Sequence, residues 1–458
     1  MAVFMVTINV TVVVVALPDL QSDLHARADE ITWVIDAYNL VGASLLLAAG
    51  WAADTYGRRR ILISGYAIFT GGALLCGLAP SIGWLIGFRV LQAVGGTALT
   101  PTSLAIVANL YPEPRARARA IGIWGVASGL GTGLGPVLGG AMTEWMGWRS
   151  VFAANAVLGG AALLVAVAVV PRSRSETARR IDVPGQILAA GVLSSLTFAL
   201  IEAPRLGWTS PAIVGLLATA VVGAVAFVVV ERRAAEPLID LRFFHDHQFS
   251  GAVFITVAAF FAFAGFIFLN SLYLQRVRGY SPLEAGLLTL PAALPTLAGG
   301  PFAGWLVSVR GPRGVLAMGT FLMAAGLGLM AAMGAGAGLP QLVGAYLVLG
   351  IGYAVINAPI STVAVSSMPR AQAAVAAAVA SSGRNVGLVM GIAVLGSIVD
   401  ARLPGLLQHA AYPVAFTEAV QTAYAAAAVV AVAATVVALL TLRTEPPAYQ
   451  ERPAAAER

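Results

Sequence analysis

The sequence contains no lysine, a single cysteine and few charged residues of either sign. All 27 basic residues are arginines, and charged residues occupy 10% of the 458 positions, whereas hydrophobic residues occupy 59%. Cys76 is the only cysteine, so the chain can form no internal disulfide. A soluble domain of this length does not need so much apolar surface, and the composition therefore excludes an ordinary water-soluble protein.

Sequence motifs for catalysis and nucleotide binding are also missing. The chain has no His-Glu-x-x-His zinc motif, no Gly-x-x-x-x-Gly-Lys-Ser/Thr phosphate loop, and no serine or cysteine nucleophile signature. His245-Asp246-His247 looks like part of a metal site, but no further ligand lies near it, and we interpret it as a solvated loop. We therefore expect no metal, no cofactor, no ATP-driven step and no enzymatic activity.

Long apolar runs recur from one end of the chain to the other. About 20 apolar residues cross a bilayer as a helix, and these runs predict an all-α integral membrane protein with fourteen transmembrane helices. The helices are expected at 1–18, 31–53, 60–79, 82–108, 119–142, 149–170, 184–203, 211–230, 250–273, 283–309, 314–335, 338–364, 374–399 and 419–442. The first helix is short, and the true start could lie further upstream.

The arginines are distributed unevenly between the predicted loops. The loops on the side of the termini hold 19 arginines and the opposite loops hold 6, while Arg89 and Arg384 fall inside helices. Positive residues accumulate in cytoplasmic loops, so we expect a cell-membrane protein with both termini in the cytoplasm. The same asymmetry accounts for the basic pI without a nucleic-acid partner.

The chain repeats its own motifs at a nearly constant offset. Gly50, Trp51, Gly57 and Arg59 recur 254 residues later, at Gly304, Trp305, Gly311 and Arg313. The series Gly125, Gly129 and Gly133 recurs 258 residues later, at Gly383, Gly387 and Gly391. Two copies of a six-helix unit explain this pattern, and such duplication is typical of secondary transporters.

The repeat predicts the division of the chain. Residues 1–170 form an N-terminal six-helix bundle and residues 249–442 a C-terminal one. Residues 171–248 form a linker with two extra transmembrane helices, and residues 443–458 form a cytoplasmic tail.

Four motifs together resemble one known family, the fourteen-helix drug:proton antiporters of the major facilitator superfamily. They are Gly50-x-x-x-Asp54-x-x-Gly57-Arg58-Arg59-Arg60, Arg89-x-x-Gln92 followed by Gly95 and Gly96, Gly135-Pro136-x-x-Gly139-Gly140, and Trp148-Arg149 with Phe152 and Asn155. The stretch that begins at Trp33, WVIDAYNL, is similar to the antibiotic-efflux branch. The resemblance covers nearly the whole chain.

The resemblance implies a major facilitator fold and proton-coupled export of drugs or other small amphipathic compounds by alternating access. The partners would be a small-molecule substrate, protons and the lipid bilayer, and we expect a monomer. One alternative keeps the fold but moves an endogenous metabolite in either direction, with altered or no proton coupling. A non-transporting membrane enzyme or sensor is a third hypothesis, but no catalytic constellation or long polar segment favours it.

One departure from the family affects the proton. Asn9 stands where the family's first helix has an acid, and asparagine cannot titrate. Asp36 is then the only carboxylate expected well inside a helix, roughly 7–8 Å below the outer surface. Burial and a nearby Arg89 would act on its proton affinity in opposite directions. We predict that Asp36 and Arg89 are proton-coupling candidates. The alternative is that Asp36 points to the outer membrane interface and serves as an anchor there.

Other polar groups inside helices predict a substrate cavity. An arginine at membrane depth must face a polar cavity or a partner, and Gln92 lies one turn from Arg89. The candidates for lining the cavity are Asn9, Gln92, Asn357, Arg384 and Asn385. Trp33, Tyr38, Phe260, Phe261, Phe263 and Phe266 are expected mainly to face lipid or pack, with one or two stacking on a substrate cation.

Two further motifs have competing interpretations. Asp54, Gly57, Arg58, Arg59 and Arg313 are predicted to form a cytoplasmic gate, although a solvated loop is the simpler interpretation. In the fifth helix, Gly125, Gly129 and Gly133 share one face, and Pro136 is expected to kink the helix beside Gly135, Gly139 and Gly140. This glycine face is either a tightly packed dimer contact or a bend that helps one bundle move against the other.

Overall fold

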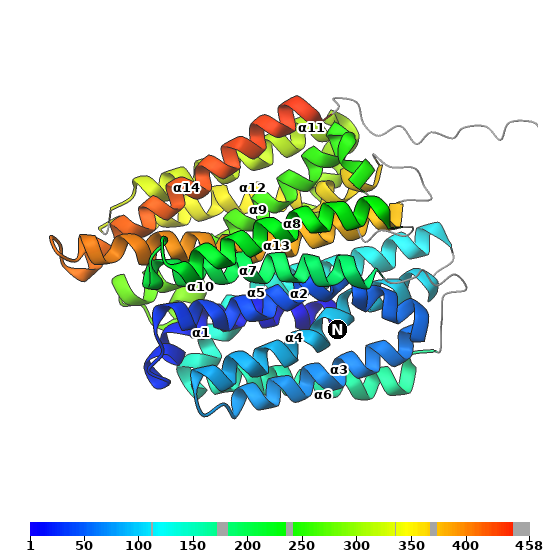
Figure 1. The fold of residues 1–458 in the computed structure, drawn as a ribbon, viewed down its shortest axis with the longest axis horizontal. Helices are drawn as coiled ribbons and strands as arrows, with labels where there is room; N and C mark the ends of the chain where they lie inside the picture. Colours follow the sequence, from blue (N-terminus) through cyan, green and yellow to red (C-terminus); the bar gives the residue numbers. More distant parts are fainter. Residues whose placement is uncertain (111–112, 172–181, 235–240, 335, 367–372, 443–458) are drawn as a thin grey trace, which may run out of the picture.

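The computed structural model describes residues 1–110, 113–171, 182–234, 241–334, 336–366 and 373–442, and every regular element in these ranges is helical. The long helices run side by side along one direction (Figure 1). They are α1 Ala2–Asp23, α2 Ala28–Tyr56, α3 Arg58–Gly77, α4 Ile82–Leu110, α5 Pro114–Met146, α6 Arg149–Val169, α7 Val183–Leu206, α8 Pro211–Arg233, α9 His247–Leu272, α10 Pro282–Ala293, α11 Pro295–Ala332, α12 Leu339–Ser366, α13 Ala373–Leu406 and α14 Tyr412–Thr441. Short η1 (Leu241–His245) and η2 (Tyr273–Val277) flank α9.

Eleven helical segments within the described ranges are long and apolar enough to cross a membrane. The chain is therefore a multi-pass membrane protein, and the prediction of an all-helical membrane fold is confirmed. α2 is not among the eleven, and it carries Asp29, Glu30 and Asp36. Fourteen crossings remain a prediction.

The helices pair in the same pattern in the first and last parts of the chain. α1 packs against α5, and α3 packs against α4 and α6; correspondingly, α9 packs against α13, and α11 packs against α12 and α14. Gly57 and Gly311, which the sequence repeat makes equivalent, both have a positive φ, of 101° and 74°. Glycine adopts this conformation at little cost, so both copies use glycine for the same backbone turn.

Three helix boundaries differ from the prediction. The helix expected over 283–309 is interrupted at Leu294, because Pro291 and Pro295 lack the N–H groups that would continue the hydrogen-bond ladder. α11 then runs through the turn expected before residue 314, broken only at Gly311. α13 continues beyond the expected end at residue 399 to Leu406, so Asp400 also lies inside a helix. The expectation that Asp36 is the only carboxylate well inside a helix is therefore wrong.

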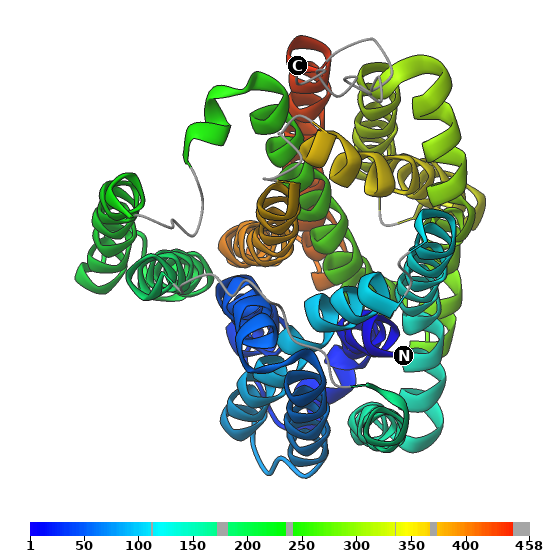
Figure 2. The ribbon, with the colours of Figure 1, turned by 90° about the vertical axis from the view of Figure 1, so that its right-hand side faces the viewer.

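The α7–α8 hairpin lies at the edge of the bundle (Figure 2). α7 packs against both α2 and α13, and it thus covers the line where the two parts of the chain meet. Gln186 Nε2 of α7 donates a hydrogen bond to the Ser44 carbonyl of α2, and Arg205 lies 3.5 Å from the Asp29 carboxylate. α8 has few buried residues and exposes apolar side chains such as Val221 and Val222, as a lipid-facing helix does.

Candidate functional site

A buried arginine forms a polar centre among α1, α2 and α4. Arg89 is fully buried, and its Nε donates to the Val34 carbonyl of α2 at 2.9 Å. Its Nη1 donates to Asn9 Oδ1 of α1 at 3.2 Å and to Gln92 Oε1 at 2.8 Å. Gln92 Nε2 in turn donates to Asn9 Oδ1 at 3.2 Å. The structure therefore brings together three predicted site residues, Asn9, Arg89 and Gln92.

Aromatic rings complete this centre. The Arg89 guanidinium lies 4.5 Å from the centroid of the Tyr38 ring and 6.0 Å from that of Phe152. Such cation–π contacts strengthen when water is excluded. Tyr38, expected mainly to face lipid or pack, is buried and stacks on a cation, but that cation belongs to the protein. No sequence spacing links Tyr38 or the Val34 carbonyl to Arg89, because the contact depends on how α2 crosses α4.

The centre holds a charge without a carboxylate. Asn9, Gln92 and the Val34 carbonyl are all neutral acceptors, and Arg89 forms no ion pair with a described residue. Burial of an unpaired charge is costly unless hydrogen bonds compensate it. Three acceptors and one close aromatic face supply that compensation, and the Nη2 of Arg89 has no hydrogen-bond partner among the described residues.

Asp36 of α2 is not part of the hydrogen-bond network of Arg89. Its side chain is fully buried, and neither carboxylate oxygen has a hydrogen-bond partner among the described residues. Thr32 lies one turn before Asp36 on α2. If Gly396 of α13 carried a side-chain carbon, that carbon would lie 3.8 Å from Thr32, so α2 and α13 are close here. Asp36 shares this face of α2 because residues four apart point the same way. The interpretation of Asp36 as an exposed interfacial anchor is not compatible with its burial.

The last part of the chain has a second cationic centre. Arg384 of α13 lies 4.9 Å above the Phe260 ring of α9. Tyr353 of α12 stacks on Phe263 with ring centroids 3.8 Å apart and packs edge-on against Phe260. Phe260 is therefore a second predicted aromatic that contacts a cation of the protein. The structure places Arg384 against Phe260 at the edge of an aromatic cluster that the sequence did not predict.

Of the two asparagines predicted to line the cavity in this part of the chain, the structure describes the side chain of one. A side-chain carbon at Gly42 of α2 would lie 3.8 Å from Asn385 Nδ2 of α13, so Asn385 lies where the two parts of the chain meet. The side chain of Asn357 lies outside the described residues, so its predicted place in the cavity is not tested.

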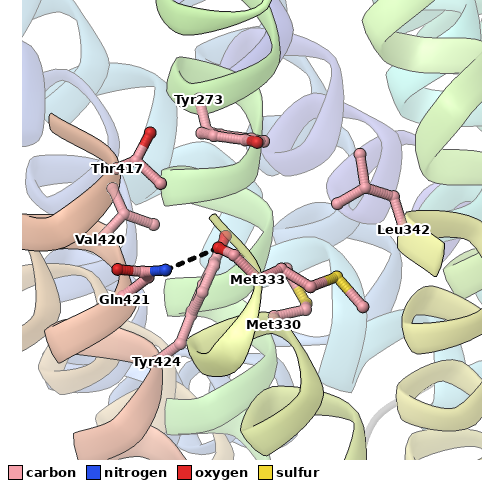
Figure 3. Close-up of a pocket in the computed structure, with 8 residues that line it drawn as sticks. All are labelled: Tyr273, Met330, Met333, Leu342, Thr417, Val420, Gln421 and Tyr424. Carbon is pink, nitrogen blue, oxygen red and sulfur yellow. Dashed lines mark hydrogen bonds between the residues drawn. The ribbon is translucent and has the colours of Figure 1, made fainter. Parts of the chain in front are cut away.

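A further buried polar cluster connects α9, α10 and α12. Tyr346 donates a hydrogen bond to Asn270 Oδ1, and Asn270 Nδ2 donates to Thr289 Oγ1 at 3.2 Å. A small cavity of about 20 Å³ lies nearby and is lined by Tyr273, Met330, Met333, Leu342, Thr417, Val420, Gln421 and Tyr424 (Figure 3). The volume suits a water molecule rather than a drug. The cluster was not predicted, since each of its polar groups stands alone in an apolar run.

The glycine motif of α5 serves contacts within the chain. Side-chain carbons at Gly135 and Gly139 would collide with Thr11 and Val12 of α1. A carbon at Gly140 would lie 2.3 Å from the Pro282 carbonyl of α10. The close approach predicted for a glycine face therefore occurs, but between helices of one molecule rather than in a dimer.

Of the three glycines predicted to form that face, the structure describes the surroundings of Gly133. Gly133 makes only an ordinary contact, since a carbon there would lie 3.7 Å from the Ala293 side chain. Gly125 lies outside the described side chains, and the predicted close contacts of Gly125 and Gly129 are not tested. The tight face runs through Gly131, Gly135 and Gly139, two residues out of register with the predicted series. α5 continues through Pro136 to Met146.

The predicted gate residues lie near the junction of α2 and α3 and beside the Gly311 turn within α11. Gly57 separates α2 from α3, Arg58 begins α3, and Arg313 follows the Gly311 turn. Arg59 Nη2 donates to the Val167 carbonyl of α6 at 2.7 Å, a contact within the N-terminal part. The Asp54 side chain lies outside the described residues, so its hydrogen bonds in the predicted gate are not tested.

Two other motifs have structural partners. Trp148 Nε1 and Arg149 Nη1 both donate to Asp23 Oδ2, at 2.9 and 2.6 Å, which joins the start of α6 to the end of α1. Asp246, the centre of the His-Asp-His sequence, accepts hydrogen bonds from the backbone N–H groups of Gln248 and Phe249. It therefore caps the N-terminus of α9.

A repeated helical bundle with polar centres at membrane depth is the architecture of a secondary transporter. The chain belongs to the Major Facilitator Superfamily: the family model of that description matches residues 1–243 and 252–458. It is thus a membrane transporter of small molecules and not an enzyme, as predicted.

The curated relatives are named for drug resistance, which confirms the predicted branch of the superfamily. The chain is 38% identical over 408 residues to "Multidrug resistance protein Stp" of Mycobacterium tuberculosis, an alignment that covers 89% of this chain and 76% of the relative. It is 35% identical over 402 residues to the "Tetracenomycin C resistance and export protein" of Streptomyces glaucescens, covering 88% and 74%. It is also 35% identical over 439 residues to "Puromycin resistance protein pur8" of Streptomyces alboniger, covering 94% and 86%.

Solved structures share the fold. A bacterial homologue of the human lysosomal transporter Spinster, in an inward-facing and occupied conformation, superposes with a TM-score of 0.69 at 19% identity, covering 97% of this chain and 95% of that one. A peptide transporter, POT, superposes with a TM-score of 0.67 at 17% identity, covering 96% and 92%. At these identities the similarity concerns the fold alone.

Proposed function

We propose that the protein exports drugs, antibiotics or other small amphipathic compounds in exchange for protons. It would act as a monomer in the cell membrane by alternating access, with residues 1–170 rocking against residues 249–442. Fourteen crossings would place both termini in the cytoplasm. The names of the relatives support the type of cargo, and the arginine asymmetry supports the orientation.

The observation that carries the proton coupling is the isolated carboxyl group of Asp36. The Arg89 centre has only neutral partners, since Asn9 replaces the family acid, and it offers no group that exchanges a proton. Asp36 is buried without a hydrogen-bond partner among the described residues, and it shares a side of α2 with Thr32, which lies close to Gly396 of α13. Separation of these helices would admit water to the carboxyl group, so its proton exchange would follow the opening of the bundle.

The other predicted residues take supporting roles in this proposal. Asn9, Gln92, Asn357, Arg384 and Asn385 would line or support the substrate cavity, with Arg89 holding α1, α2 and α4 together. Asp54, Gly57, Arg58, Arg59 and Arg313 would close the cytoplasmic side. The close α5 contacts around Pro136, Gly139 and Gly140 would be the surface on which the two halves rock.

The proposal is tested in everted membrane vesicles with a fluorescent cationic drug and an imposed pH gradient. We expect Asp36→Asn to reduce the rate of proton-driven uptake at least tenfold. Drug binding, and counterflow of the drug without a pH gradient, should persist. Asp400→Asn, which changes a carboxylate of α13, is the matched control and should keep most of the gradient-driven uptake. Full coupling in the Asp36→Asn protein would assign the proton to another group.

A metabolite transporter is the second candidate, because Asn9 departs from the family at the position of its acid. A drug-susceptibility panel in a pump-deficient host, with and without a protonophore, separates the two. Increased resistance that the protonophore removes supports the drug exporter. No change over a broad panel favours the metabolite transporter.

A further inference from the structure

A proline near the end of α1 leaves one backbone carbonyl of that helix without its usual partner. Pro18 lies inside α1 and has no N–H group, so it cannot donate to the carbonyl four residues earlier. That carbonyl belongs to Val14, which is buried, so water cannot readily replace the missing donor. An unsatisfied buried carbonyl is costly.

The missing donor comes from the opposite half of the molecule. Ser271 Oγ of α9 donates to the Val14 carbonyl at 3.1 Å. Gln275 Nε2, in the π-helical turn η2, donates to the Val15 carbonyl at 2.9 Å and to Ser271 Oγ at 3.0 Å. Ser271 is itself buried. Two hydrogen bonds therefore join neighbouring carbonyls of α1 to Ser271 of α9 and Gln275 of η2, and a third links these two side chains to each other.

The geometry of α9 at this point is unusual. η2 (Tyr273–Val277) is a π-helical turn that follows directly on the α-helix, and the Arg278 N–H donates to the Tyr273 carbonyl five residues earlier. π-turns are rare and are often associated with function. Ser271 and Gln275 emerge from adjacent turns on one side of α9, so both reach α1.

Other contacts between the halves lie at the same end of the bundle, where α1 terminates and α2 begins. The Leu283 N–H of α10 donates to Glu144 Oε2 near the end of α5 at 3.2 Å. A side-chain carbon at Gly396 of α13 would meet Thr32, early in α2. This end of the bundle is thus closed along three helix pairs, and the α1–α9 pair contributes the network of side chain to backbone hydrogen bonds.

We propose that Pro18, Ser271 and Gln275 form a latch that holds this end of the transporter closed and sets the population of the state open at this end. The inference rests on the alternating access of the proposed function. Separation of α1 from α9 removes both donors, and because Pro18 prevents α1 from satisfying the Val14 carbonyl itself, only incoming water can replace them. The latch therefore releases when water enters, which couples opening to hydration.

The latch is tested by measuring the distance between spin labels on the two halves of the purified full chain in lipid nanodiscs. Met146→Cys in α5 and Val414→Cys in α14 supply exposed label sites at this end, and Cys76 is buried and can stay. Loss of one ordinary hydrogen bond changes an equilibrium about two- to tenfold. We expect Ser271→Ala and Gln275→Leu each to raise the ratio of open to closed molecules by that factor.

Matched controls separate the latch from general loosening. Ser22→Ala removes an exposed hydroxyl that bonds only within α1, and Gln408→Leu removes an exposed amide at the same end. Both should leave the distance distribution unchanged, and Ser271→Thr, which keeps the hydroxyl, should remain close to wild type. An unchanged distribution in Ser271→Ala and Gln275→Leu would overturn the proposal.

A double-mutant cycle tests the role of the proline. Pro18→Ala restores an N–H that can donate to the Val14 carbonyl within α1. In the Pro18→Ala protein, Ser271→Ala should therefore change the logarithm of the ratio of open to closed molecules by at most half as much as it does in the wild-type protein. Additive effects would overturn the proline part of the proposal. If Pro18→Ala does not fold, the cycle between Ser271→Ala and Gln275→Leu replaces it, because the shared hydrogen bond predicts non-additivity. These distances are measured without drug or pH gradient, so a failure of the proposed export would leave the result interpretable.

Discussion

A methyl group added at Gly140 should force α5 and α10 apart. The carbon would lie 2.3 Å from the Pro282 carbonyl oxygen, whereas an ordinary contact has a distance of 3.4–4 Å. The obstacle is backbone, so no side-chain rotation relieves it, and the helices must separate by roughly 1 Å. Overpacking of this kind costs about 1–3 kcal/mol. This cost changes the equilibrium between the state in which α5 and α10 are packed and the state in which they are apart by about 5- to 150-fold, in favour of separation.

The assay compares Gly140→Ala with Gly160→Ala, where the added carbon meets nothing within 4 Å. Thermal unfolding of the purified proteins and drug export in vesicles are both measured. We expect Gly140→Ala to lose at least 80% of export and to unfold at lower temperature, while Gly160→Ala resembles wild type. Gly286→Ala, whose carbon would lie 2.3 Å from the Pro136 carbonyl oxygen across the same helix pair, should reproduce the defect. Equal behaviour of Gly140→Ala and Gly160→Ala would refute the argument.

Three further predictions concern the buried centre, the repeated turn and the orientation. Arg89→Lys should reduce export at least tenfold at normal expression, because a lysine cannot reproduce the guanidinium contacts with Val34 and Asn9 together; wild-type export would contradict this role. Gly311→Ala should lower stability by about 1–3 kcal/mol in thermal unfolding, since φ is 74° and ψ is 165° there, a conformation essentially restricted to glycine; Gly304→Ala, with open space around the added carbon, is its control. Reporter fusions inserted between residues 407 and 411 should read external and those after residue 443 cytoplasmic, and the opposite readout would invert the topology.

The sequence alone determined the class of the protein and its repeated plan. Apolar runs of membrane length identified a helical membrane protein, since a bilayer leaves few other ways to satisfy the backbone. The motifs were sufficient for the family, which the family model and the relatives confirm. Gly57 and Gly311 were found by their equal spacing, because a positive φ demands glycine wherever the same turn recurs.

The tertiary structure decided which of these residues meet. Arg89 and Gln92 were found from the sequence because they lie one turn apart, but Tyr38 and the Val34 carbonyl reach Arg89 only through the crossing of α2 and α4. The tight glycine face of α5 was predicted two residues out of register, since glycine is abundant along that helix and only the neighbours α1 and α10 select which glycines are close. The pairing of the Val14 carbonyl with Ser271 spans 257 residues. A proline in the sequence shows that a carbonyl is freed, but only the packing of two helices shows which side chain reaches it.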